Sequence, residues 1–122
     1  MAIGGGRVLV IEDDEGMREA IESLLDTVGY ATSSYASAEA LIAAGTPEDA
    51  RCIVSDVRLP AMSGLDLITE LRARGARLPV ILVTAHDSPA QRGEAGRRGA
   101  AAYLPKPFAG GALLAAIENA MQ

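Results

Sequence analysis

The sequence has 122 residues, of which 49% are hydrophobic and 22% are charged. This length and composition predict a single compact domain that can bury a core without disulfides. The net charge of −5 and the aromatic content of 3% argue against nucleic acid as the main partner. Phosphate backbones select basic surfaces, and exposed bases stack on aromatic rings.

The single cysteine and the apolar patterning predict a cytoplasmic protein. Cys52 cannot form an intramolecular disulfide, and its place in the apolar run CIV predicts a buried thiol in a reducing compartment. No stretch approaches the roughly 18 consecutive apolar residues of a membrane span. The opening MAIGGGR lacks the apolar segment of a secretory signal. We expect residues 1–6 to form a flexible leader and residues 7–122 a folded domain.

Strand and helix patterns alternate from the start of the predicted domain. The run RVLVI at 7–11 is too short for a helix and rich in branched side chains, which predicts a buried strand. Apolar residues then recur at spacings of three and four, which predicts a helix over 17–28. Residues 31–35 form a more polar strand typical of a sheet edge. A short helix follows over 37–45, with a serine at its start and a glycine at its end.

The alternation continues through the second half of the chain. Apolar runs predict strands at 52–54 and 80–83 and a weaker one at 101–104. Helical spacing of leucine and isoleucine predicts helices over 65–71 and 113–121. Five strand–helix repeats with short connections imply a parallel sheet that is covered on both faces.

One predicted helix departs from this pattern. Residues 88–99 read SPAQRGEAGRRG and contain no large apolar side chain. Gly93 and Gly96 lie within the helix, and each costs about 1 kcal/mol relative to alanine. We expect this helix to form by topology but to be weakly anchored.

Polar side chains follow four of the predicted strands. In a doubly wound sheet, ligands bind beyond the carboxyl ends of the strands. Converging carboxylates repel one another unless a hard cation such as Mg²⁺ lies among them, and an ammonium group suits a phosphoryl oxygen. The side chains concerned are Glu12, Asp13 and Asp14, then Asp56, then Thr84 and His86, and finally Lys106 before Pro107.

Each of these residues also has a simpler interpretation when taken alone. Acids that precede a helix are often a solvated first turn, and Asp56 alone is more often a cap than a nucleophile. Thr84 in a strand usually packs, while Lys106 usually faces solvent and His86 usually belongs to a loop. The combination is more specific than any single residue, because a suitable polar residue must follow each of four separate strands.

Four segments together resemble the receiver domain of a two-component response regulator, in the flavodoxin-like phosphoacceptor family. They are VLVIEDD, IVSDVRLPAMSG, ILVTAH and YLPKPF, and the similarity spans about residues 7–121. This resemblance implies an α/β fold with a single doubly wound, five-stranded parallel sheet in the order 2-1-3-4-5 and five helices. It also implies that the domain catalyses only its own phosphorylation and dephosphorylation, and is not an enzyme with a separate substrate.

The resemblance implies that Asp56 accepts a phosphoryl group from the phosphohistidine of a sensor histidine kinase or histidine phosphotransfer protein. It further implies a Mg²⁺ ion held directly by Asp13 and Asp56, through water by Glu12, and by the backbone carbonyl of Arg58. The family often has two aspartates where this sequence has a glutamate followed by an aspartate. Asp14 falls outside that pair.

Three further features follow from the same resemblance. Thr84 is expected to hydrogen-bond one phosphoryl oxygen, and Lys106 to pair with another. The peptide bond between Lys106 and Pro107 is expected to be cis, since X-Pro bonds carry only a small trans preference. Gly64 fits a tight turn beyond Pro60.

Phosphorylation is expected to draw the Thr84 hydroxyl inward and to vacate space that the Tyr103 ring fills. The fourth helix, fifth strand and fifth helix would then carry the signal, with phosphorylation-dependent dimerisation as one outcome. The alternative is that Tyr103 is only an amphipathic aromatic residue at a sheet edge. Arg58 and His86, two residues beyond Asp56 and Thr84, are expected to modulate dephosphorylation without being needed for phosphorylation.

Rival functions are less consistent with the residues. A phosphatase with an aspartyl nucleophile needs a second acid two residues later, where this chain has Arg58. A dinucleotide-binding loop must follow the first strand, whereas the glycines at 4–6 precede it. A receiver-like module that never takes phosphate stays open because of Glu12, although the set of Asp56, Thr84 and Lys106 argues against it.

The biological context has three open alternatives. The domain is a stand-alone regulator, the receiver of a DNA-binding transcription factor, or a receiver joined to a kinase. The segment VSDVRLPAMSG is most similar to receivers attached to helix-turn-helix transcription factors, which is an analogy. The domain itself is not expected to bind nucleic acid or a membrane.

Overall fold

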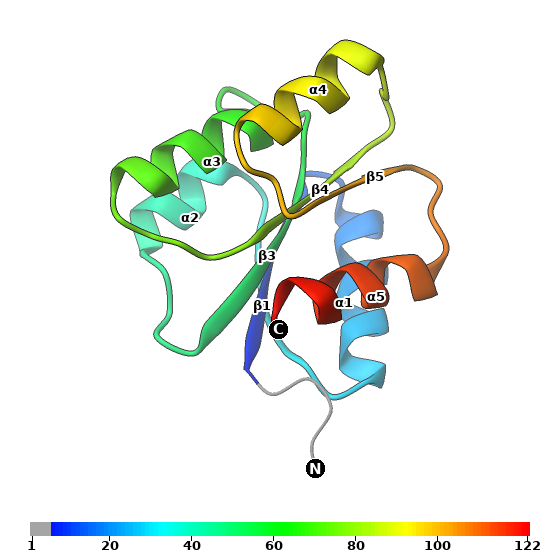
Figure 1. Ribbon diagram of the computed structural model, residues 1–122. Helices are drawn as coiled ribbons and strands as arrows, with labels where there is room; N and C mark the ends of the chain where they lie inside the picture. The colour runs from blue at the N-terminus through cyan, green and yellow to red at the C-terminus, as the bar shows by residue number, and fades with distance from the viewer. Residues whose placement is uncertain (1–5) are drawn as a thin grey trace.

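In the computed structural model, residues 6–122 are described, so the predicted leader lies almost entirely outside the described residues. Within that range strands and helices alternate (Figure 1). The elements are β1 (Arg7–Ile11), α1 (Glu15–Thr27), β2 (Ala31–Tyr35), α2 (Ala38–Ala44), β3 (Ala50–Asp56), α3 (Gly64–Ala73), β4 (Val80–Thr84), α4 (Pro89–Arg97), β5 (Ala102–Pro105) and α5 (Gly110–Ala120).

The five strands form one parallel sheet in the order β2-β1-β3-β4-β5, which confirms the predicted fold class. The register places the strand ends side by side. Ile11 is opposite Ser55, Asp56 is opposite Val83, and Thr84 is opposite Pro105. Residues that follow different strands therefore meet at one edge of the sheet.

Helices cover both faces of the sheet, so the strands are apolar on both sides (Figure 1). Along β1, Leu9 and Ile11 point to one face and Val8 and Val10 to the other. The first face packs against buried residues of α2, α3 and α4, namely Ala38, Leu41, Leu67, Ile68, Leu71 and Ala95. The second face packs against buried residues of α1 and α5, namely Ile21, Leu25, Leu113 and Ile117.

The central strand β3 contains the single cysteine. Cys52 is fully buried in the cluster on the α1 and α5 side, as its apolar surroundings predicted. Burial raises the pKa of its thiol to about 12. Among residues 6–122, no helix combines the length and the apolar character needed to cross a membrane.

Strand β3 is longer than the strand that was predicted from the apolar run at 52–54. It extends over Ala50–Asp56, because Arg51 and Ser55 interrupt the apolar pattern without interrupting the strand. Ser55 is fully buried, and its hydroxyl donates a hydrogen bond to the backbone oxygen of Asp56 at 2.9 Å. Asp56 is the last residue of the strand.

Side chains cap the first turns of four helices. The carboxylate of Asp14 accepts a hydrogen bond from the Met17 N–H at 2.8 Å. Ser37, Ser63 and Ser88 cap α2, α3 and α4 in the same way. Asp14, which the sequence placed outside the acidic pair, therefore starts α1 directly after that pair.

Helix α4 is attached mainly by polar contacts. Ala95 is its one buried residue, consistent with the apolar-poor sequence. At its carboxyl end, the Arg98 guanidinium donates to the Asp66 carboxylate at 3.0 Å and to the Thr69 hydroxyl at 3.2 Å, both on α3. At its amino end, Gln91 makes three hydrogen bonds that are described below.

Two glycine-to-alanine substitutions should have opposite effects on stability. A β-carbon at Gly64 would collide with the backbone oxygen of Asp56, whereas one at Gly96 meets no atom within 4 Å. Gly64→Ala should lower the free energy of unfolding by about 2 kcal/mol. Gly96→Ala should raise it by about 0.5–1 kcal/mol, by restricting the unfolded chain. Urea unfolding followed by circular dichroism measures both, and a Gly64→Ala variant as stable as wild type would contradict the close approach.

Candidate functional site

Charged side chains from three strand ends meet at the carboxyl edge of the sheet. Glu12 follows β1, Asp56 ends β3, and Lys106 follows β5. The Lys106 ammonium nitrogen lies 2.8 Å from Glu12 Oε1 and 3.2 Å from Asp56 Oδ2. These side chains are mostly buried, with exposed fractions of 13% for Lys106, 2% for Glu12 and 11% for Asp56.

The acids form a compact cluster around this lysine. One carboxylate oxygen from each of Glu12, Asp13 and Asp56 lies within 4.8 Å of the other two. Asp13 is exposed, so solvent reaches the cluster from its side. Carboxylate oxygens are the ligands that hard divalent cations prefer. The donor set therefore fits a Mg²⁺ ion, and the cluster can hold a metal.

Burial and the lysine act on Glu12 in opposite directions. Burial raises the pKa of the Glu12 carboxyl, and the neighbouring charge of Asp56 adds to this, while Lys106 works against it. Burial alone would lower the pKa of Lys106, but its hydrogen bond to Glu12 and the charges of both acids outweigh it, so this pKa is raised. The ammonium therefore stays charged between the two carboxylates.

Backbone contacts fix the position of Glu12. Its Oε2 accepts a hydrogen bond from the Asp14 N–H at 3.2 Å, and its own N–H donates to the Tyr35 carbonyl at 3.1 Å. Its carbonyl accepts a hydrogen bond from the Arg18 guanidinium on α1 at 2.8 Å. The family resemblance implied a water-mediated metal ligand at Glu12, and in the structure its two carboxylate oxygens contact Lys106 and the α1 cap.

The predicted modulators Arg58 and His86 each contact, through the backbone, the site residue that lies two positions earlier in the chain. The Arg58 N–H donates to Asp56 Oδ1 at 3.2 Å, and its side chain is exposed. The His86 N–H donates to Thr84 Oγ1 at 2.9 Å, and its side chain is exposed as well. The Lys106–Pro107 peptide bond is cis.

Gln91, on α4, joins residues that the sequence singled out, although sequence analysis did not identify it. Its side-chain nitrogen donates to Thr84 Oγ1 at 3.2 Å, to the His86 carbonyl at 3.0 Å and to Tyr103 Oη at 2.9 Å. Gln91 is the third residue after the Ser88 cap. Its position in the first turn was the one sequence feature that could have pointed to Gln91. A polar residue does not stand out by periodicity in a helix that is polar on all sides.

Tyr103, on β5, is held by further residues of the loop and helix that follow β4. Its hydroxyl donates to the Asp87 carboxylate at 2.9 Å. The Arg92 guanidinium lies 4.9 Å from the centre of the Tyr103 ring and also contacts Asp87 at 2.9 Å. Hydrogen bonds from Arg92 and Tyr103 lower the pKa of the Asp87 carboxyl.

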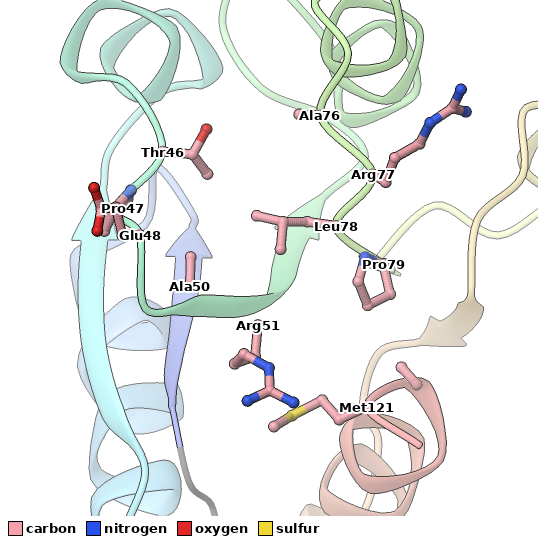
Figure 2. Close-up of a pocket in the computed structure, with 11 residues that line it drawn as sticks. Thr46, Pro47, Glu48, Ala50, Arg51, Ala76, Arg77, Leu78, Pro79 and Met121 are labelled. Carbon is pink, nitrogen blue, oxygen red and sulfur yellow. The ribbon is translucent and has the colours of Figure 1, made fainter.

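A separate hollow of about 460 Å³ lies at the amino-terminal ends of β3 and β4 (Figure 2). Its lining includes Ala50 at the start of β3, Pro79 before β4 and Met121 after α5. Figure 2 shows the side chains of Arg51 and Arg77 around it. The hollow shares no lining residue with the acidic cluster, which belongs to the opposite edge of the sheet.

Comparison with known sequences decides the family. Residues 8–118 match the response regulator receiver domain. The chain belongs to this family. This receiver domain is 45% identical over 114 residues to the transcriptional regulatory protein FixJ of Azorhizobium caulinodans. The match covers 93% of this chain and 54% of that protein. The chain thus spans about half the length of that relative.

Solved structures agree with this assignment. The structure of FixJ-N has a TM-score of 0.88 and 31% sequence identity, and the match covers 98% of this chain and 95% of that one. A response regulator receiver domain protein from Clostridium thermocellum has a TM-score of 0.86 and 27% identity, covering 95% and 94%. The sheet order and the helices of this receiver domain are therefore those of a known fold.

Removal of the lysine should destabilise the metal-free receiver domain. Lys106→Met leaves the buried Glu12 carboxylate next to Asp56 without a compensating charge, and should lower the free energy of unfolding by about 3 kcal/mol at pH 8. Urea unfolding in the presence of a chelator measures this loss.

The loss should also depend on pH. The pKa of the Glu12 carboxyl is raised in the fold, so the folded state favours the protonated carboxyl. Protonation of Glu12 therefore stabilises the fold at low pH, and this stabilisation is lost as the pH rises through the folded-state pKa. A protonated Glu12 needs no ammonium partner, so the difference between wild type and Lys106→Met should shrink from pH 8 to pH 5. A difference that stays constant over this range would contradict the buried charge as its cause.

Proposed function

We propose that this receiver domain accepts a phosphoryl group on Asp56, with Mg²⁺, from the phosphohistidine of a sensor histidine kinase or a histidine phosphotransfer protein in the cytoplasm. The observation that carries the proposal is the meeting of Asp56 with Glu12, Asp13 and Lys106 at one sheet edge. Family membership supports a role in two-component signalling.

The chemistry begins with the Asp56 carboxylate. One of its oxygens bonds to phosphorus as the bond between phosphorus and the donor imidazole nitrogen breaks. The electron pair returns to that nitrogen, which takes up a proton, and the product is an acyl phosphate on Asp56. Bound Mg²⁺ supplies positive charge against the repulsion between carboxylate and phosphoryl oxygens. Asp13, Asp56 and the Arg58 carbonyl would hold the ion directly, and Glu12 through water.

Lys106 and Thr84 stabilise the transferred group in this proposal. The Lys106 ammonium already contacts Asp56 Oδ2, so it lies where charge develops on a phosphoryl oxygen. The buried Thr84 hydroxyl oxygen accepts hydrogen bonds from the His86 N–H and the Gln91 amide, which leaves its proton to donate to another phosphoryl oxygen. In this proposal the Thr84 hydroxyl moves toward the phosphoryl group and Tyr103 responds. These two changes would alter the surface formed by α4, β5 and α5.

The domain in this proposal modifies only itself and is not an enzyme with a separate substrate. The sequence of FixJ from Azorhizobium caulinodans is about twice as long as the match and is named a transcriptional regulatory protein. We therefore propose that this receiver controls an output domain. A module that never takes phosphate is the alternative, and the phosphatase alternative lacks its second acid at the exposed Arg58.

Phosphorylation has a direct test by intact-protein mass. Incubation with Mg²⁺ and acetyl phosphate should add one phosphoryl group to the wild-type protein. It should add none to Asp56→Asn, because the amide that replaces the carboxylate is not a nucleophile toward phosphorus. Asp26→Asn, at an exposed carboxylate of α1, is the matched control and should label like wild type. Unlabelled wild type, or equal labelling of Asp56→Asn, would overturn the proposal.

The lifetime of the phosphoryl group should depend on the two predicted modulators. Arg58→Ala and His86→Ala each remove an exposed side chain beside Asp56 or Thr84, which opens the approach of water to phosphorus. Both variants should label at the wild-type rate and then lose the group severalfold faster. Arg77→Ala, an exposed arginine at the other edge, is the control. Unchanged lifetimes in the first two variants would refute the role.

A further inference from the structure

We propose that Gln91 is a positioning residue that holds Thr84 and Tyr103 in the arrangement of the unphosphorylated domain. The inference rests on the proposed function, in which Thr84 turns toward a phosphoryl group on Asp56. Gln91 lies on α4 and contacts neither Asp56 nor the other acids by any hydrogen bond within residues 6–122. It acts through the two residues that it joins.

The hydrogen bonds of Gln91 connect three separate segments. Its side-chain nitrogen reaches the end of β4 at Thr84 Oγ1, the following loop at the His86 carbonyl, and β5 at Tyr103 Oη. Thr84 is fully buried and Gln91 is half-buried, so these contacts are partly shielded from water. One side chain therefore links the residue that would sense phosphate to the residue that would report it.

The chemistry of the partners fixes which end of the Gln91 amide faces them. The His86 carbonyl can only accept a hydrogen bond, and the Tyr103 hydroxyl already donates its proton to Asp87. Both partners therefore require the NH₂ group. This group has two protons for three acceptors, so the bond to Thr84, the longest at 3.2 Å, competes with the other two.

Phosphorylation would end the competition among the three acceptors by drawing Thr84 away. If the Thr84 hydroxyl turns toward a phosphoryl oxygen, it leaves Gln91, whose two protons then match the two remaining acceptors. An inward turn of Tyr103 must in addition break the contacts of its hydroxyl with Gln91 and Asp87 and of its ring with Arg92. The Gln91 amide therefore keeps its bond to Tyr103 Oη, stabilises the starting position of the ring and opposes its inward turn.

The affinity for a phosphoryl analogue tests the proposal. Beryllofluoride with Mg²⁺ binds a receiver aspartate as a phosphoryl group would. Gln91→Met keeps the length of the side chain but removes both donors, so it should bind beryllofluoride on the order of fivefold more tightly than wild type, the equivalent of about one hydrogen bond. Arg97→Met is the matched control on the same helix, since Arg97 is exposed and, among residues 6–122, pairs only with Glu94, and it should bind like wild type.

A second measurement separates positioning from a general effect on the fold. Fluorine NMR of protein labelled with 3-fluorotyrosine should show the Tyr103 signal of analogue-free Gln91→Met shifted toward its position in the beryllofluoride complex. Tyr103→Phe assigns that signal among the three tyrosines. The affinity for Mg²⁺ alone should be unchanged, because Gln91 does not contact the acids.

The outcomes distinguish this inference from the function beneath it. Wild type that binds no beryllofluoride overturns the proposed phosphoacceptor role itself. Wild type that binds it, together with a Gln91→Met affinity within twofold of wild type and an unmoved Tyr103 signal, overturns only the role of Gln91. An equal gain in Arg97→Met would assign the effect to helix α4 in general and would overturn it too.

Discussion

A buried ammonium between two carboxylates is the interaction on which this edge of the molecule depends. Lys106 bridges Glu12 and Asp56, so it ties the end of β5 to the ends of β1 and β3. Without the lysine, two acids would meet in a nearly water-free position, where an uncompensated charge is costly. Its own burial is tolerated because both acids raise the pKa of the ammonium. In the proposed function, the same contact places positive charge beside the Asp56 oxygen that attacks phosphorus.

The molecule divides into a part held by apolar packing and a part held by polar contacts. The sheet and helices α1, α3 and α5 bury leucine, isoleucine and valine on both faces, which gives the acids a rigid support. Helix α4 buries only Ala95 and is attached through Gln91 and Arg98. Hydrogen bonds can exchange partners at little net cost, whereas buried apolar surface cannot. A signal from Asp56 is therefore expected to travel through the polar part.

Sequence patterns were sufficient for a parallel sheet covered on both faces and for the place of the acids, whereas the strand order came from the family resemblance. Strand–helix alternation determines a parallel sheet, and a parallel sheet gathers the residues that follow its strands, so Asp56 and Lys106 could be paired across 50 positions. The contacts of Gln91 and Arg18 could not be predicted, because side-chain bonds between segments leave no periodic signal. The full length of β3 was missed for a related reason, since a buried serine looks polar in sequence.

The interior position of Cys52 has a practical consequence for spectroscopy. Its side chain is fully covered in the central strand, and its thiol has a pKa of about 12. At neutral pH the thiolate, which is the form that alkylating reagents attack, is therefore scarce. A new cysteine on the solvent side of α4 can accept a fluorophore or a spin label while the native one stays in place. Motion of this helix can then be followed in an otherwise unaltered chain.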